Sequence, residues 1–431
     1  MLDGDRQHRS ALTDLNENPS TTGKLTTLTC SAKAINKRHT PSMVTKKSNS
    51  EQSPTVPASN RRNSRIQVTS PSEREILDIV RRHQVISRAA IALETDLAQQ
   101  SVHRLVEQLI GRGLLQSGKA IKNGRGKPSP RIELVREAVY AIGVAVNTDS
   151  MAVCLADLGC HILEQVQIQT PPMSRNASLI SVNGAIERLL VRHCVPRDRL
   201  IGVGFAISGF FVADRRQVNA PEPLQDWSLI DLEPILEDCF ELPVWIENNA
   251  TTAAIGESLL GAGLWARSFV YLSFNYGFGG GIVIDGKPYF GANGNAGEMI
   301  IYDEDEMGRR PALQFLIKEL RANGVDIDSV EDLRFRFDPT WPGVESWIER
   351  TLPALDRVIN TVAGLFDPQA IVFGGQLPVQ LGRMLIERAR FWGKHRYGVA
   401  PKMPKLVLGE ANGNAAVIGA ALVPLKECFF G

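Results

Sequence analysis

The chain has 431 residues, which allows roughly two to four domains and excludes a single small module. With 43% hydrophobic and 22% charged residues, its composition is that of a soluble globular protein rather than a fibre or a membrane protein. The charge is unevenly spread, because residues 1–135 hold 22 Lys and Arg against 12 Asp and Glu, whereas residues 136–431 hold 26 against 35. The basic front favours contact with a polyanion such as nucleic acid, although a solvated tail would have the same charge.

Neither a membrane segment nor a disulfide framework is predicted. No window reaches the ~18 uninterrupted apolar residues of a membrane span, and residues 1–6 lack the apolar core of a signal peptide. The six cysteines are scattered without a C-x-x-C pair. We therefore expect a cytoplasmic protein whose thiols are buried or idle.

Residues 1–70 are rich in Ser, Thr, Asn and Lys and poor in large apolar residues, a composition that predicts a disordered basic arm. The first aromatic residue of the chain is Tyr140. Single-stranded nucleic acid is usually bound by stacking its bases on aromatic rings. If the front of the chain binds nucleic acid, we therefore expect it to read the groove of a duplex.

A helical pattern begins at residues 72–75, which have the form of a capping box and precede an apolar face. A second helix is predicted over residues 87–93. A third, over about residues 98–111, has apolar residues at i, i+3, i+4, i+7 and i+8, so that one face is buried. Two short strands follow at residues 114–115 and 131–134, and a glycine-rich turn with two cations lies between them.

This order of three helices and a hairpin predicts a winged helix-turn-helix over residues 71–135, with the third helix in the major groove of DNA. Base edges would be read by the polar side chains at the start of that helix, which are Gln99, Gln100, Ser101, His103 and Arg104. Phosphates or the minor groove would be contacted by Arg88, Arg125 and Lys127. A three-helix adaptor that binds another protein is the alternative interpretation.

From Tyr140 onward, short β-type runs alternate with helical stretches, which predicts α/β layers with more than one sheet. The Asp285-Gly286 pair predicts a β-hairpin turn inside this body. The predicted strands are residues 140–146, 201–207, 269–274, 282–285 and 370–373, and the predicted helices are residues 178–191, 249–260, 345–365 and 380–391.

Seven motifs occur in a fixed order along the chain. They are the Gly-Arg-Gly-Lys-Pro turn at 124–128, Gly-Val-Gly-Phe-Ala-Ile-Ser-Gly at 202–209, Val-Trp-Ile-Glu-Asn-Asn-Ala at 244–250, Gly-Phe-Gly-Gly-Gly at 277–281, Gly-Ala-Asn-Gly-Asn-Ala-Gly-Glu at 291–298, Asp-Pro-Gln-Ala-Ile-Val-Phe-Gly-Gly at 367–375 and Gly-Ala-Ala at 419–421. Together they resemble the ROK family of repressors and sugar kinases. The resemblance implies an N-terminal winged helix-turn-helix followed by a two-lobed actin-like (ribonuclease H-like) sugar-kinase-type domain over residues 140–431.

The family includes both sugar kinases and sugar-responsive regulators, and three departures favour a regulator. Where the kinases have an aspartate that acts as general base, this chain has Asn249, whose neutral amide cannot accept a proton. The two phosphate loops of the kinases correspond to residues 147–149 and 275–277, which lack the expected glycines and small hydroxyl. We therefore expect no catalytic residue and no bound ATP.

The zinc-binding pattern of the family is also absent. The positions that would ligate the metal are occupied by Ile301, Asp305, Met307 and Ala312. One carboxylate cannot hold a tetrahedral zinc ion, so we expect no metal and no other cofactor.

The resemblance maps the sugar-contacting positions onto Gly209, Asn248, Asn249 and Glu298, which keep donors and acceptors suited to sugar hydroxyls. Two further contacts of the family fall at Ile301 and at about Pro223. The remaining aromatic residue of this region, Trp227, either walls the sugar pocket or fills the core.

We therefore expect a DNA-binding transcriptional regulator, a repressor rather than an activator, of carbohydrate uptake or metabolism genes. It would bind a double-stranded operator as a homo-oligomer, a dimer or a tetramer, and respond to a sugar or sugar derivative. The alternatives are a residual sugar kinase and a regulator that is controlled by a protein partner.

Overall fold

A computed structural model of the chain describes residues 70–121, 129–168, 174–299, 307–393, 396–411 and 414–430. The predicted arm over residues 1–70 therefore lies almost entirely outside the described residues. The elements of the N-terminal module, which we define as residues 71–134, are α1 (Pro71–His83), β1 (Ile86–Ser87), α2 (Arg88–Glu94), α3 (Gln99–Gly111), β2 (Leu115–Ile121) and β3 (Ser129–Leu134).

The three predicted helices of this module are confirmed, but the capping box of α1 lies two residues earlier than predicted. The Ser70 hydroxyl accepts from the backbone N–H of Glu73, and the Glu73 carboxylate accepts from the Ser70 backbone N–H. Pro71 follows as the first helical residue, a position where its missing N–H has no partner to lose. The prediction overlooked Ser70 because the pattern was read from the next serine. Ser87 caps α2 as predicted.

The strands of the module form an antiparallel sheet in the order β1-β3-β2. β2 and β3 are the two predicted strands, and both are longer than the apolar pattern indicated. β1 was not predicted, because a two-residue strand has no periodicity of its own. The predicted turn with its two cations lies outside the described residues.

The first lobe, residues 140–248, is built on a five-stranded sheet in the order β10-β7-β4-β5-β6. β4, β5 and β6 form an antiparallel meander, β7 pairs with β4 in parallel, and β10 pairs with β7 in parallel. The elements from residue 136 to the end of the lobe are η1 (Arg136–Ala138), β4 (Tyr140–Val146), β5 (Met151–Asp157), β6 (Ile162–Ile168), α4 (Arg175–Arg192), η2 (Arg197–Arg199), β7 (Leu200–Ile207), β8 (Phe210–Val212), β9 (Gln217–Asn219), η3 (Glu222–Trp227), α5 (Glu233–Phe240) and β10 (Val244–Asn248).

The second lobe, residues 269–408, repeats this topology. Its sheet has the order β13-β12-β11-β14-β15, in which β11, β12 and β13 form the meander and β14 and β15 add in parallel. The remaining elements are α6 (Asn249–Leu260), η4 (Ala262–Leu264), β11 (Phe269–Phe274), β12 (Phe278–Ile284), β13 (Lys287–Pro288), η5 (Met307–Arg309), α7 (Leu313–Ala322), α8 (Val330–Arg336), α9 (Val344–Phe366), β14 (Ala370–Gly375), α10 (Val379–Arg388), β15 (Lys405–Leu408) and α11 (Ala415–Phe429). Two lobes with one shared strand order are the architecture that the resemblance implied, and the predicted hairpin at Asp285-Gly286 joins β12 to β13.

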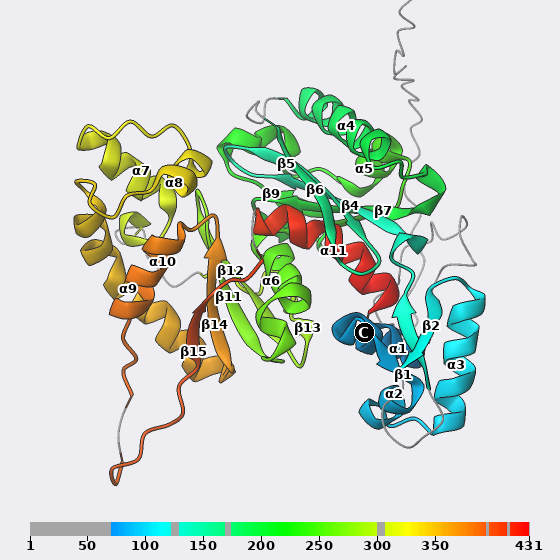
Figure 1. The fold of residues 1–431 in the computed structure, drawn as a ribbon. Coiled ribbons are helices and arrows are strands. Elements are labelled where there is room, and N and C mark those ends of the chain that lie inside the picture. The colour runs from blue at the N-terminus through cyan, green and yellow to red at the C-terminus, as the bar shows by residue number, and fades with distance from the viewer. Residues whose placement is uncertain are drawn as a thin grey trace, which may run out of the picture. The chain divides into compact units, whose positions relative to one another are not determined.

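Two buried helices, α6 and α11, cross between the lobes (Figure 1). α6 follows the last strand of the first sheet and packs on β12 and β11 of the second, whereas α11 follows the last strand of the second sheet and packs on β4 and β7 of the first. Small residues bring their backbones together: a Cβ on Gly419 would lie 1.7 Å from the carbonyl oxygen of Thr252. A Cβ on Gly204 of β7 would lie 1.9 Å from the carbonyl oxygen of Ala420. Such close packing makes the crossing stiff.

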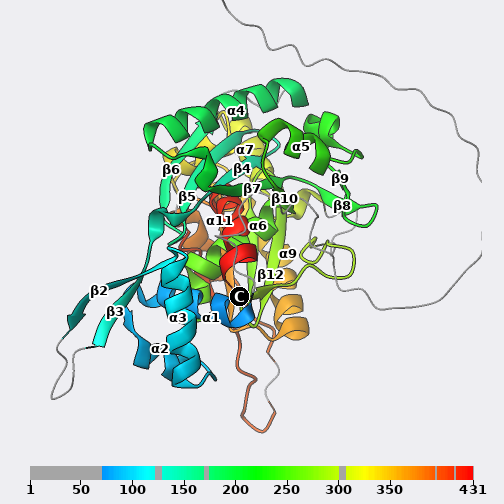
Figure 2. The same cartoon turned by 90° about the vertical axis from the view of Figure 1, so that its right-hand side faces the viewer.

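The core of the N-terminal module continues into this crossing. Leu77 and Val80 of α1 belong to one buried cluster with Leu422, Leu425 and Phe429 of α11. Figure 2 shows α1 beside the C-terminal end of α11, with α2, α3 and the β2–β3 hairpin extending away from it. The module is therefore packed against the body by the same hydrophobic effect that builds its own core.

Candidate functional site

The first polar cluster lies where β10 ends and α6 begins. Asn248 is the N-cap of α6, and its side-chain oxygen accepts from the backbone N–H of Ala250 at 2.7 Å. Its amide group donates to the carbonyl oxygen of Gly209 at 2.6 Å and to Glu298 Oε1 at 3.2 Å. Three of the four predicted sugar-contacting residues therefore meet directly around one asparagine amide.

The backbone of this cluster requires glycine at two positions. Gly209 has φ +138°, and a Cβ there would lie 2.6 Å from the carbonyl oxygen of Asn219. Gly297, the residue before Glu298, has φ +101°, and a Cβ there would lie 2.2 Å from the carbonyl oxygen of Gly280. These conformations are open to glycine and strained for other residues. The glycines of both motifs thus allow the backbone to bring Asn248 and Glu298 within hydrogen-bonding distance.

Asn249 is the fourth predicted sugar-contacting residue, and its side-chain hydrogen bonds go to other partners than those of Asn248. Its amide group donates to Asn147 Oδ1 at 2.9 Å and to Ser208 Oγ at 2.8 Å. Its side-chain oxygen is buried and has no hydrogen-bond partner among the residues that the structure describes. Since an unpaired buried acceptor is unfavourable, this oxygen is suited to receive a hydroxyl donor from a ligand.

Glu298 faces Asn248 from the other lobe. Burial raises the pKa of Glu298, and the positive charge of Arg310 opposes this rise. A carboxyl group with a raised pKa beside an amide donor can accept or donate a hydrogen bond, depending on pH. The pair therefore offers a ligand both kinds of hydrogen-bonding group.

Sequence reasoning missed a charged cluster next to this site. Arg215 forms an ion pair with Glu247, and its guanidinium lies 4.6 Å from the ring centroid of Phe211 and 4.8 Å from that of Phe290. Burial raises the pKa of Glu247 to about 7, although the charge of Arg215 opposes the rise. No local pattern could have revealed this pair, because the two residues are 32 positions apart.

Asn295 reinforces the same junction between the lobes. Its side-chain oxygen accepts from the backbone N–H of Phe211 at 2.7 Å, and its amide donates to the Phe211 carbonyl at 2.8 Å. The segment that ends in Glu298 is therefore fastened to β8 of the first lobe.

The positions of the kinase phosphate loops make other contacts in this chain. The carbonyl oxygens of Asn275 and Tyr276 accept from the backbone N–H groups of Leu313 and Gln314, at 2.9 and 3.3 Å. These donors at the start of α7 are the kind of group that would otherwise bind an anion. Burial raises the pKa of Asp149, and a hydrogen bond with the backbone of Val330 in α8 opposes the rise.

Trp227 fills the core rather than walling a pocket. Its side chain is fully buried, and its ring centroid lies 5.5 Å from that of Phe205 in β7. Of the positions that would ligate zinc in the family, Ala312 is buried in the core of the second lobe and Met307 begins η5. Ile301 and Asp305 lie outside the described residues. Across the described ranges, no three His, Cys, Asp or Glu side chains gather in a way that could hold a metal ion.

The second candidate site is the outer face of α3. Gln99, Gln100, His103 and Arg104 are exposed, whereas Ser101 is half-buried. The opposite face of the helix is buried against the module. Four of the five side chains predicted to read bases therefore point to solvent from the first turns of one helix.

Arg88 has a structural contact that the sequence did not reveal. Its guanidinium pairs with Glu107 and so ties α2 to α3. Its predicted contact with phosphate stays a prediction. Arg125 and Lys127 lie outside the described residues.

The repeated sheets and the polar cluster at the start of α6 define a two-lobed fold of the sugar-kinase type. Residues 141–303 match the ROK family, which confirms the resemblance that the four motifs between residues 202 and 298 indicated. In the part of the chain that the structure describes, no helix has the length and apolarity needed to cross a membrane.

Several relatives carry names that describe regulators. The xylose repressor of Bacillus spizizenii is 29% identical over 241 residues, which are 54% of this chain and 60% of that protein. The xylose repressor of Caldicellulosiruptor bescii is 26% identical over 82% of this chain and 94% of that protein. The transcriptional dual regulator NagC of Escherichia coli is 24% identical over 52% of this chain and 55% of that protein. These names agree with the expected regulator.

Two solved structures share the fold. A ROK family transcriptional regulator, described as a homologue of the Escherichia coli MLC protein, aligns with a TM-score of 0.57 and 20% identity over 83% of this chain and all of that chain. A ROK family glucokinase of Streptomyces griseus, solved with glucose and AMPPNP, aligns with a TM-score of 0.53 and 20% identity over 65% of this chain and 98% of that chain. Residues 140–431 are about two thirds of the chain. The alignment with the glucokinase is short enough to fit within this range, whereas the alignment with the regulator is longer and must include residues before 140.

Proposed function

We propose that this chain is a DNA-binding transcriptional regulator, a repressor of carbohydrate uptake or metabolism genes that responds to a sugar or sugar derivative. The observation that carries the proposal is the exposed polar face of α3 on a module that packs against a ROK domain. The names of the relatives support it. Such a regulator would act in the cytoplasm, on the operator of its target genes.

The DNA-binding part would be a winged helix-turn-helix over residues 71–135. α2 and α3 would form the helix-turn-helix, with α3 in the major groove and the β2–β3 hairpin as the wing. Gln99, Gln100, Ser101, His103 and Arg104 would contact bases, and Arg88, Arg125 and Lys127 would contact phosphates or the minor groove. The basic charge of residues 1–135 supports this arrangement, because it would draw the module to the duplex.

The effector would bind where Gly209, Asn248, Asn249 and Glu298 lie. The unpaired oxygen of Asn249 and the carboxyl group of Glu298 would accept hydrogen bonds from sugar hydroxyls. Residues 140–431 as a whole would form the sensing domain. A sugar that binds one arrangement of the lobes better than another would shift the population between them.

We propose that this site does not transfer phosphate. The amide of Asn249 has no basic atom, and it already donates to Asn147 and Ser208. The likeness to the glucokinase therefore supports a shared fold only. In this proposal the chain lacks the general base that phosphate transfer needs.

The active form would be a homodimer or a homotetramer that binds a pseudo-palindromic operator. A dimer would place its two recognition helices about 34 Å apart, one helical turn of DNA. This spacing predicts two half-sites whose centres are about 10 base pairs apart or a multiple of that distance.

Selection of bound duplexes from a random library tests the DNA-binding proposal. The full chain should enrich a pseudo-palindromic sequence, and Gln100→Ala should relax the preference at one position of each half-site. Gln314→Ala, a change of the same type in the second lobe, serves as the matched control and should enrich the same sequence as the unmodified chain. Failure to enrich any sequence would contradict the proposal.

Calorimetric titration with D-xylose and with N-acetylglucosamine tests the sugar site, since relatives of this chain are named xylose repressor and N-acetylglucosamine repressor. We expect one of them to bind, and we expect Asn248→Ala to weaken binding about tenfold because a ligand would lose the support of Glu298. An affinity that Asn248→Ala leaves unchanged would exclude this cluster as the sugar site.

A further inference from the structure

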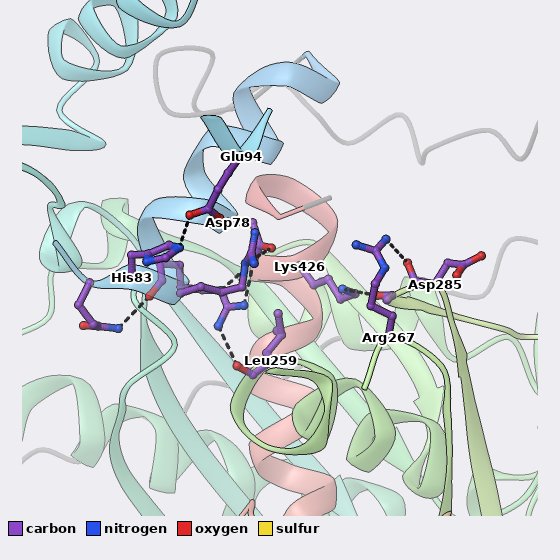
Figure 3. Close-up of polar contacts among 11 residues, drawn as sticks. Asp78, His83, Glu94, Leu259, Arg267, Asp285 and Lys426 are labelled. Carbon is purple, nitrogen blue, oxygen red and sulfur yellow. Dashed lines mark hydrogen bonds and ion pairs between the residues drawn. The ribbon is translucent and has the colours of Figure 1, made fainter. Parts of the chain in front are cut away.

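The C-terminal end of α6 is bonded to α1 of the N-terminal module. Arg81 Nη1 donates to the carbonyl oxygen of Leu259 at 2.7 Å. Its Nε and Nη2 donate to Asp78 Oδ1 at 3.0 and 2.8 Å. Figure 3 shows Asp78, Leu259 and Lys426 gathered where α1, α6 and α11 meet. Only 5% of Arg81 is exposed, so the pairing of its guanidinium is needed to keep the charge buried.

The hydrogen bond from Arg81 to Leu259 caps the C-terminal end of α6 with a side chain from the N-terminal module. The last four carbonyl groups of a helix have no partner within it, and a cation at this end also interacts favourably with the helix dipole. Leu259 is one of these four residues, since α6 ends at Leu260. The N-terminal module thus supplies the cation that pairs with the Leu259 carbonyl at the far end of α6.

The near end of α6 is capped by the candidate sugar site. Asn248 is its N-cap and also bonds Gly209 and Glu298. The helix has 12 residues, so about 18 Å of one rigid element separates the two caps. The sugar site and the N-terminal module therefore hold opposite ends of the same helix.

The surroundings of α6 favour movement of the helix as a unit. Residues 249–259 are buried, and a Cβ on Gly256 would lie 3.1 Å from Gly419 of α11. The carboxylate of Glu257 accepts from the backbone N–H groups of Ala262 and Ala411 at 2.8 and 3.2 Å. Packed helices of this kind shift by rigid sliding rather than by bending.

Arg81 lines a cavity of about 210 Å³ together with Gln84, Arg136 and Gly159, so α1 has room to adjust where it meets the body. The Phe430 ring centroid lies 5.3 Å from the Arg81 guanidinium. Lys426 Nζ donates to the Gly286 carbonyl at 3.2 Å, which ties α11 to the β12–β13 turn.

We propose that α6 couples the sugar site to the N-terminal module, and that Arg81 is the positioning residue through which α1 follows the end of α6. The inference rests on the proposed function, because it assigns a route to the regulation of that function. It predicts that a substitution at Asn248 alters the local stability of α1, and that this effect depends on Arg81.

Hydrogen–deuterium exchange of the full chain tests the coupling without DNA or sugar. Asn248→Ala removes the N-cap, and we expect it to raise amide exchange in α1 about fivefold. In a chain that already carries Arg81→Met, the same change should raise exchange in α1 less than about twofold. Unchanged exchange in α1 after Asn248→Ala, or an equal increase in both backgrounds, would overturn the proposal.

Matched variants separate coupling from general loosening. Arg82→Met changes the exposed neighbour of Arg81 and should leave the fivefold response intact. Asn183→Ala removes a half-buried asparagine of α4, which bonds Cys239 rather than α6, and should not alter exchange in α1. Arg81→Lys keeps a donor for the Leu259 carbonyl and should restore the response that Arg81→Met removes; if it does not, the bond to Leu259 is not the link.

The outcome is independent of the proposed function. Loss of duplex binding in the unmodified chain would refute the DNA-binding proposal, whereas the exchange response reports only on α6 and α1. A chain that binds its duplex but shows no response to Asn248→Ala in α1 would refute the coupling alone.

Discussion

The amide nitrogen of Asn249 lies 2.9 Å from Asn147 Oδ1 and donates a hydrogen bond to it. The contact joins the first residue of α6 to the end of β4, at positions that the resemblance maps to the general base and the first phosphate loop of the ROK kinases. Both side chains are neutral amides, so neither can take up a proton from a hydroxyl group.

We expect no sugar-dependent release of ADP from ATP by the unmodified chain. Asn249→Asp restores a carboxylate, yet we expect it to remain inactive, because the loop at Asn275 and Tyr276 is bonded to the start of α7. A coupled assay with glucose, D-xylose and N-acetylglucosamine measures both proteins. Sugar-dependent turnover by the unmodified chain would show that it is a kinase.

The crossing of α6 and α11 predicts opposite effects for two glycine substitutions. Gly419→Ala would place a Cβ 1.7 Å from the Thr252 carbonyl oxygen, and we expect it to lower the free energy of unfolding by about 3 kcal/mol or more. Gly364→Ala is the matched control in α9, where a Cβ meets no atom within 4 Å. It should raise the free energy of unfolding by about 0.5 kcal/mol, because alanine favours the helix. Urea denaturation measures both, and equal effects would contradict the packing described here.

Glu247 predicts a change of stability with pH. Burial raises its pKa from 4.5 to about 7, so the folded chain holds this proton more tightly than the unfolded chain does. The resulting stabilisation is present below pH 4.5 and is lost as the pH rises to about 7. Glu247→Gln removes the titration, so its free energy of unfolding relative to the unmodified chain should increase by on the order of 2 kcal/mol between pH 4.5 and pH 8.

Denaturation of both proteins at the two pH values gives this difference. The exposed Glu222→Gln serves as the control, and its effect should stay within about 0.5 kcal/mol at either pH. A constant difference between Glu247→Gln and the unmodified chain would show that Glu247 has the same proton affinity in both states.

The sequence predicted elements whose pattern is local. β4, β11 and α6 have the predicted bounds, and α3 begins within a residue of its predicted start. The apolar face of α3 predicted that helix, and the alternation of apolar β-type runs with helical stretches predicted the strands and helices of the body. α11 was represented only by its Gly-Ala-Ala motif, because a helix that is apolar on all sides has no periodic signal.

The candidate site was predicted by resemblance, and its contacts were not. The motif at residues 244–250 identified Asn248 and Asn249, but nothing in it indicated that they bond in different directions. Arg81 follows the buried Leu77 by four residues, but nothing local indicated its partner Leu259, which lies 178 positions away. Long-range pairs of this kind depend on the packing of complete elements, which no local pattern contains.

If the N-terminal module reads duplex DNA, its binding to a selected duplex weakens steeply as the salt concentration rises, and a titration at several salt concentrations measures this. Six phosphate contacts in a dimer, from Arg88, Arg125 and Lys127 of each chain, predict a slope of about −5 for the logarithm of the binding constant against the logarithm of salt concentration. Arg104→Ala should weaken binding by about 1–3 kcal/mol, whereas Arg309→Ala, a change at an exposed arginine of the second lobe, should not. Absence of duplex binding at low ionic strength, or binding that neither salt nor Arg104→Ala affects, would contradict the account.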